Sequence, residues 1–170
     1  MKLTYEDLFA RMTDLTLLAN PPVLGEFSGS QTSTDPKSQY DPETDTYIEW
    51  GANEDYKGFR YIEGDAYVVF DSEGPGVIWR IWAGSFLIGR IKIYIDDMEN
   101  PAVDLDYKEY MDRYFYTAQY GNCPNLTPTL SRGRQRLIPI PFNKRCKITL
   151  TGIPEWGTYY QFTYSKYPKD

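Results

Sequence analysis

Histidine is absent from this chain of 170 residues. Its absence excludes Ser-His-Asp and Cys-His catalysis, histidine-ligated metal sites and histidine pH switches. Any acid–base chemistry must therefore come from carboxylates, tyrosine, lysine or cysteine. The aspartates lack the spacing of a calcium-binding loop, so we expect no metal and no other cofactor.

Cysteine is scarce, and Cys123 and Cys146 are the only two. Two cysteines are too few for a disulfide framework or a zinc site. A single bridge between them and two free thiols both remain open.

Positive charge and long apolar runs are also lacking. Lys and Arg total 18 against 24 Asp and Glu, which gives a net charge of −6. We therefore expect neither nucleic acid nor an anionic membrane as a partner. The N-terminus lacks the apolar core of a signal peptide and no apolar run approaches the length of a membrane span, so we expect a soluble chain. Its cellular compartment stays open. One local basic cluster is interpreted as a solvated strand edge or an intersubunit contact: Arg132, Arg134, Arg136, Lys144, Arg145 and Lys147.

Aromatic residues are abundant instead, at 16% of the chain, with 16 tyrosines. Tyrosine has an apolar ring and a polar tip, so it suits wet interfaces and sugar sites as well as cores. The length predicts a single domain with enough chain to bury a core.

The first part of the chain predicts a helix and then an irregular segment. Thr4 and Asp7 form a capping-box pattern before apolar residues at helical spacing, which predicts a helix over residues 5–19 within an N-terminal unit of residues 1–20. Residues 21–63 are rich in Ser, Thr, Asp, Pro and Gly but also contain aromatics, so we expect an ordered wrapping segment with one short strand near residues 46–50.

Residues 64–170 carry most of the strand signals. In residues 88–96, isoleucines alternate with Arg, Lys and Tyr, which is typical of a strand buried on one face. Together the strands predict a mainly β fold, an antiparallel β-sandwich of jelly-roll type with an N-terminal α-helix. Further strands are expected at residues 66–70, 77–82, 102–105, 136–142, 146–151 and 159–164.

The stretch over residues 73–82 reads Glu-Gly-Pro-Gly-Val-Ile-Trp-Arg-Ile-Trp. Period-two alternation would give two faces, one with Val77, Trp79 and Ile81 and one with Ile78, Arg80 and Trp82. An arginine between large apolar neighbours predicts that its face meets a ligand, a sheet edge or another subunit.

Several motifs, in the same order along the chain, resemble glycoside hydrolase family 172. The resemblance covers essentially the whole chain. The motifs are YDPETDTYIEW at residues 40–50, the stretch at 73–82, RIKIYID at 90–96, PIPF at 139–142, KRCKI at 144–148 and YYQ at 159–161.

The resemblance implies the first half of a furanosidase, or a shortened relative, acting on fructofuranose- or D-arabinofuranose-containing glycans or dianhydrides. Members of the family have two tandem jelly rolls, assemble as trimers or hexamers and retain anomeric configuration through two glutamates in the second jelly roll. We therefore expect a homo-oligomer that binds carbohydrate and is inactive alone. The alternative is a non-catalytic carbohydrate-binding or self-assembling domain.

Two acids are weak catalytic candidates on sequence alone. Retaining hydrolysis needs two carboxyl groups about 5–5.5 Å apart. Glu49, beside Trp50, and Glu73, before the Gly-Pro-Gly turn, are the acids nearest large aromatics. The ordinary alternative for both is a solvated or hydrogen-bonded acid at a strand end.

Five residues are candidates for contacting a sugar: Asp41, Trp50, Trp79, Arg80 and Trp82. A tryptophan can stack on a sugar ring, although tryptophans in strands are more often part of a core. Arg80 could instead pair with an acid in its own sheet, and Asp41 could cap a turn.

Overall fold

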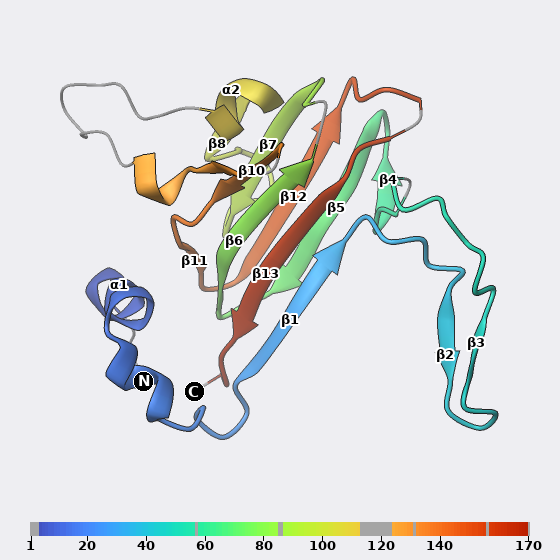
Figure 1. Cartoon of the computed structure of the whole chain (residues 1–170). Helices are drawn as coiled ribbons and strands as arrows, with labels where there is room; N and C mark the ends of the chain where they lie inside the picture. The colour runs from blue at the N-terminus through green and yellow to red at the C-terminus, as the bar shows by residue number, and fades with distance from the viewer. Residues whose placement is uncertain are drawn as a thin grey trace.

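Two antiparallel sheets pack face to face in the computed structural model (Figure 1), which describes residues 4–56, 58–84, 87–112, 124–130, 132–155 and 157–169, without the side chains of Leu18 and Pro124. Sheet I has the order β1 (Phe27–Thr32), β13 (Tyr160–Lys166), β6 (Gly76–Gly84), β10 (Gly133–Arg136) and β9 (Thr129–Leu130), and β11 (Ile140–Phe142) also pairs with β6. Sheet II has the order β4 (Tyr61–Glu63), β5 (Ala66–Glu73), β12 (Arg145–Thr151), β7 (Arg90–Ile95) and β8 (Val103–Asp106).

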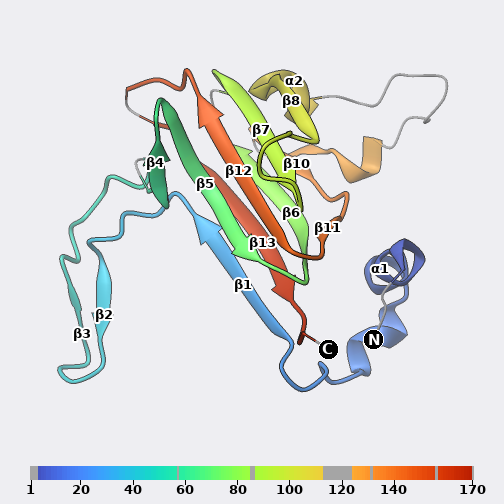
Figure 2. The same cartoon turned by 180° about the vertical axis from the view of Figure 1, so that it is seen from behind.

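The chain crosses repeatedly between the sheets. Strands β5, β6 and β7 lie in sheets II, I and II, and β12 and β13 lie in sheets II and I. Figure 2, seen from behind, shows sheet II in front of sheet I. The predicted antiparallel β-sandwich of jelly-roll type is confirmed.

The hydrophobic core lies between the two sheets. Ile91 and Ile93 of β7 are fully buried, which confirms the alternation predicted for this strand. Phe70 of β5 is also fully buried, and its ring meets Phe162 and Tyr164 of sheet I at centroid distances of 5.6 and 5.3 Å. Aromatic contacts therefore join the sheets at the centre.

The N-terminal helix begins as predicted but ends early. Helix α1 (Tyr5–Thr13) has the predicted capping box between Thr4 and Asp7. The carboxylate of Asp14 then accepts a hydrogen bond from Thr16 N at 2.9 Å and caps a separate 3-10 turn, η1 (Leu15–Ala19). The predicted helix over residues 5–19 is therefore two elements, because a capping aspartate restarts the backbone hydrogen bonds.

Two shorter helical elements lie between β8 and β9 in the chain. They are α2 (Tyr107–Asp112) and the 3-10 turn η2 (Pro124–Leu126). Among the described residues, no helix has the length and apolar character required to cross a bilayer.

The segment between residues 21 and 63 contains four strands rather than the single strand predicted. They are β1, β2 (Gln39–Asp41), β3 (Thr46–Ile48) and β4. β1 reads Phe-Ser-Gly-Ser-Gln-Thr and pairs along its whole length with β13. Its sequence carries little strand propensity, so the pairing with β13 imposes the conformation.

The prediction of a single strand over residues 136–142 is also wrong. β10 ends at Arg136 and β11 begins at Ile140, and Pro139 lies between them. A proline has no N–H for the ladder, so the chain leaves the sheet and rejoins β6.

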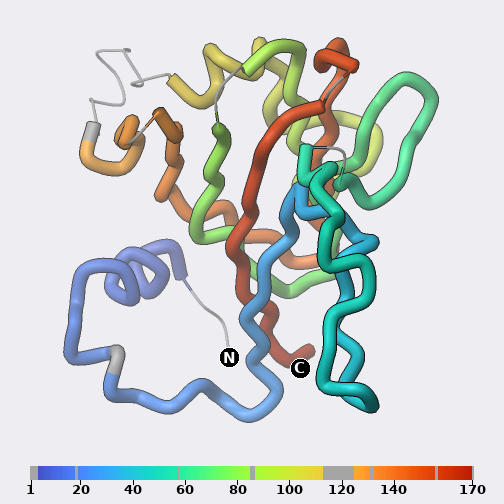
Figure 3. Tube along the Cα trace, turned by 45° about the vertical axis from the view of Figure 1, so that its right-hand side comes forward, coloured from blue at the N-terminus to red at the C-terminus, as the bar shows by residue number. Residues whose placement is uncertain are grey.

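Residues 39–50, which we call the arm, stand apart from the sandwich. Within the arm β2 and β3 pair with each other and with neither large sheet. Figure 1 shows the arm projecting from the body beyond β1 and β4, and in Figure 3, with this side turned forward, the arm is the blue-green segment to the right of the blue first strand. The base is fixed by buried Asp35, whose carboxylate accepts the backbone N–H groups of Lys37 and Glu54, each at 3.0 Å.

Candidate functional site

A β-bulge in β6 brings the candidate side chains of this strand together. Thr163 of β13 pairs with Arg80 but Tyr164 pairs with Ile78, so Trp79 is the extra residue. Ile78 and Ile81 consequently both face the core. The predicted division of β6 into alternating faces is therefore wrong, because the bulge shifts the alternation by one residue.

Trp82 lies flat across β6 and β10. A Cβ atom added to Gly133 would lie 2.3 Å from Nε1 of Trp82, and one added to Gly84 would lie 3.0 Å from its Cη2. Only glycine at these two positions leaves room for the indole. One face of the ring is thereby held against the backbone of the sheet.

Arg80 extends between two amide side chains on neighbouring strands. Its Nε donates to Gln135 Oε1 of β10 at 2.8 Å, and one NH group donates to Gln161 Oε1 of β13 at 3.2 Å. Burial lowers the pKa of Arg80. No carboxylate is among its described hydrogen-bond partners, so the expected pairing with an acid is not what the structure shows.

We call Trp79, Arg80, Trp82, Gln135 and Gln161 the outer tryptophan face. Trp79 Nε1 donates to Ser165 Oγ of β13 at 2.9 Å, which fixes the indole on this side of sheet I. A flat ring beside a guanidinium and two amides has the groups needed to bind a sugar by its C–H face and its hydroxyls.

Three other candidates lie on the arm, away from this face. Trp50 is 76% exposed and its ring meets Tyr47 at 5.2 Å. The Asp41 carboxylate accepts hydrogen bonds from the Thr44 hydroxyl at 2.8 Å and from the backbone N–H of Glu43 at 3.0 Å, and these bonds lower its pKa. Asp41 therefore caps a turn, and Glu49 follows β3 with a backbone φ of +51°.

Glu73 lies at the end of β5 in sheet II. Its carboxylate is 3.5 Å from Lys169 Nζ, and both side chains are at least 71% exposed, so this pair contributes little. Glu73 and Glu49 belong to separate elements, and nothing in the described residues pairs them. The pKa is lowered for eight described carboxyl groups, those of Asp7, Asp14, Glu26, Asp41, Asp71, Asp96, Asp97 and Asp112.

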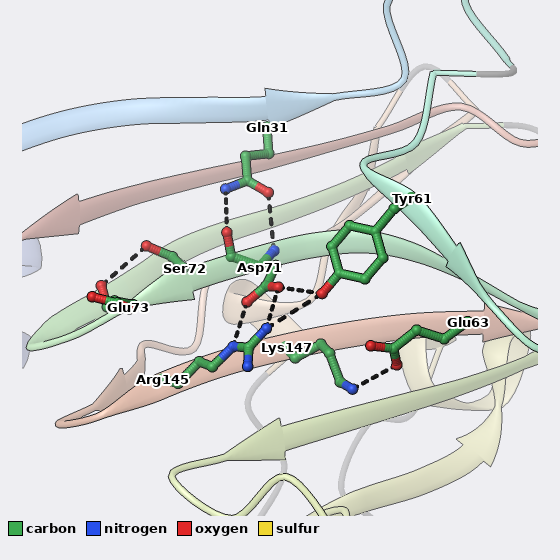
Figure 4. A network of polar contacts seen from close by, with 8 residues as sticks. All are labelled: Gln31, Tyr61, Glu63, Asp71, Ser72, Glu73, Arg145 and Lys147. Atoms are coloured by element: carbon green, nitrogen blue, oxygen red, sulfur yellow. Dashed lines mark hydrogen bonds and ion pairs between the residues drawn. The ribbon is translucent and has the colours of Figure 1, made fainter.

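A polar network on sheet II surrounds Asp71 (Figure 4). The Asp71 carboxylate accepts two hydrogen bonds from Arg145, at 2.8 and 2.6 Å, and one from the Tyr61 hydroxyl. Burial opposes ionisation of Asp71, but these donors outweigh it and lower the pKa. Burial, followed by the neighbouring Asp71, raises the pKa of Tyr61 to about 12.

Gln31 connects this network to the other sheet. From β1 its Nε2 donates to the Asp71 carbonyl at 2.9 Å, and its Oε1 accepts from the Asp71 N–H at 3.0 Å. The amide side chain thus hydrogen-bonds β5 as a neighbouring strand would. Sequence reasoning missed this contact, because polar residues 40 positions apart carry no signal that they meet.

An open groove of about 520 Å³, which we call the edge groove, lies beside this connection. Three aromatic residues contribute to its walls, Phe27, Tyr164 and Tyr167. Arg60 and Lys166 also line it, and their side chains form no hydrogen bond or ion pair with any described residue. The groove therefore combines aromatic surface with two available cations.

A comparison with known protein families shows to which family the chain belongs. The profile of the GH172 first beta-sandwich domain matches residues 30–170. The chain belongs to the GH172 family. No curated protein matched this GH172 domain. The matched residues include sheet II, the arm, most of the edge groove and all of sheet I except the first three residues of β1, whereas α1 precedes them.

Cys146 of the GH172 domain is a free thiol in the core. Burial raises its pKa to about 12, so the thiol stays protonated at neutral pH. Cys123, the other member of the predicted cysteine pair, lies outside the described residues. In the part of the chain described, no group of His, Cys, Asp and Glu has the arrangement of a metal site.

The basic cluster of the GH172 domain is only partly a solvated edge. Arg136 is buried and donates to the Tyr110 carbonyl at 2.7 Å, with its guanidinium 4.3 Å from the centre of the Tyr110 ring. Lys147 is also buried and pairs with Glu63 at 2.7 Å. A carbonyl oxygen and a carboxylate from other elements bind these two cations, and the local sequence does not reveal such partners.

Proposed function

We propose that this GH172 domain is the N-terminal jelly-roll domain of a furanosidase-like glycoside hydrolase that acts on fructofuranose- or D-arabinofuranose-containing glycans and is inactive by itself. Family membership carries the proposal. The resemblance assigns the catalytic glutamates to the second jelly roll. The separation of Glu49, after β3 in the arm, from Glu73, at the end of β5, supports inactivity, because retaining hydrolysis needs two carboxyl groups about 5–5.5 Å apart.

The first prediction is that residues 1–170 do not hydrolyse aryl α-D-fructofuranosides or α-D-arabinofuranosides. The rate at which the aryl alcohol is released, measured by its absorbance, should equal the rate for the Glu49→Gln/Glu73→Gln variant. Circular dichroism provides the control that both proteins are folded. Turnover by the unmodified chain that the double substitution abolishes would contradict the proposal and make these glutamates catalytic.

A second candidate function is non-catalytic carbohydrate binding at the outer tryptophan face. The observation that favours it is the flat placement of Trp82 over Gly84 and Gly133, with Arg80 beside it. Here Trp79, Arg80 and Trp82 are the proposed sugar contacts, whereas Trp50 and Asp41 on the arm lie on a separate element.

For this function we expect Trp82→Ala to weaken binding of a fructofuranose oligosaccharide by about 10-fold, since an aromatic contact contributes about 0.5–1.5 kcal/mol beyond its buried area. Isothermal calorimetry measures the affinity without depending on tryptophan fluorescence. The matched control is Trp50→Ala, which should leave affinity unchanged. Equal affinities for wild type and Trp82→Ala would eliminate the outer tryptophan face as a sugar site.

A further inference from the structure

The arm exposes a contiguous cluster of three aromatic rings, and Ile48 adds exposed apolar surface to the same hairpin. Tyr40, Tyr47, Ile48 and Trp50 are 51, 52, 54 and 76% exposed. The rings of Tyr40 and Tyr47 are 5.4 Å apart, and those of Tyr47 and Trp50 are 5.2 Å apart. Contiguous apolar surface on a soluble domain generally marks an interaction site.

The arm is also held in one conformation. Asp35 hydrogen-bonds the backbone on both sides of its base, and the Tyr40 hydroxyl donates to Asp45 at 2.9 Å near its tip. A segment ordered in advance loses little conformational entropy on binding. These contacts fit a docking element better than an unstructured loop.

Charge indicates what the arm binds. Residues 39–50 contain four acids and no Lys or Arg: Asp41, Glu43, Asp45 and Glu49. The edge groove offers the opposite charge, because Arg60 and Lys166 line it without a described side-chain partner, whereas its two acids, Asp71 and Glu73, already face Arg145 and Lys169. The groove also offers aromatic surface, including Phe27, which is 55% exposed.

We propose that the arm of one copy docks into the edge groove of a second copy. The arm's aromatic rings pack on Phe27 and Tyr167, and its carboxylates face Arg60 and Lys166. Arm and groove are different surfaces, so the contact is head-to-tail and joins copies into a closed ring or a chain. This inference goes beyond the proposed function, because it does not depend on binding or cleavage of a sugar.

Sedimentation velocity and light scattering over a range of concentrations test the contact. An arm variant, Trp50→Ser, and a groove variant, Arg60→Glu/Lys166→Glu, should each weaken self-association by about 30-fold or more, as expected for a central aromatic or a paired charge. Mixing the two variants should restore association, because the groove variant supplies an intact arm and the arm variant an intact groove. The mixture should stop at a one-to-one complex.

Two matched controls separate this contact from general surface effects. Leu15→Ser removes another exposed apolar side chain, and Arg90→Glu/Lys92→Glu reverses two cations on the outer face of sheet II. Both should associate like the wild type, with thermal unfolding confirming that every variant is folded. A wild type that stays monomeric would overturn the proposal, as would a groove variant that associates normally or a mixture that forms no complex.

Discussion

Replacing Phe70 with alanine is expected to lower the free energy of unfolding by about 3–5 kcal/mol, the range for large aromatic truncations in a packed core. Phe70 is fully buried in sheet II and meets Phe142 and Phe162 of sheet I, at ring distances of 6.4 and 5.6 Å. Its removal leaves a cavity between the sheets that rigid strands cannot close. Urea unfolding followed by circular dichroism measures the change.

The control for this prediction is Leu24→Ala, since Leu24 is 99% exposed. It should change the free energy of unfolding by less than about 0.5 kcal/mol. A loss below about 1 kcal/mol for Phe70→Ala would mean that the contacts between the sheets around Phe70 are not those described.

Replacing Gln31 with leucine is expected to cost about 2–4 kcal/mol. Leucine is similar in size, but it leaves the N–H and the carbonyl of Asp71 without their partner, and an unsatisfied buried polar group costs about 1–3 kcal/mol. Urea unfolding gives the stability, and hydrogen exchange at the Asp71 amide should become faster in the variant.

Gln39→Leu is the matched control for this second prediction. Gln39 is exposed and its side chain donates a single hydrogen bond, to the Pro36 carbonyl at 2.9 Å. We expect its replacement to change stability by less than about 0.5 kcal/mol. Equal effects of the two substitutions, or unchanged exchange at Asp71, would show that Gln31 does not join the sheets.

The sequence predicted those elements in which local pattern and tertiary packing agree. Strand β7 is regular and buried on one face, so its isoleucines alternate in the sequence and in the structure. The capping box of α1 is a contact between neighbouring residues and was also predicted. Strand β1 was not predicted, because its polar sequence becomes a strand only when β13 lies beside it.

The outer tryptophan face was predictable only in part. Trp79, Arg80 and Trp82 are among the five predicted sugar contacts, but period-two alternation separated Trp79 from the other two, and Gln135 and Gln161 were not predicted. The extra residue in β6 depends on pairing with β13, and the local sequence carries no sign of it. The edge groove was missed for a related reason, since Arg60 and Lys166 are far apart in the chain and line the same groove only in the folded sandwich.

The extra residue at Trp79 affects how relatives should be aligned to this chain. A relative with an uninterrupted β6 would be one residue shorter there, and an alignment without a gap would shift every following position by one residue. Its counterpart of Trp82 would then be aligned with Ile81 and be mistaken for a core residue. A single-residue gap opposite Trp79 keeps each position on its own side, so that transferred substitutions reach the intended surface.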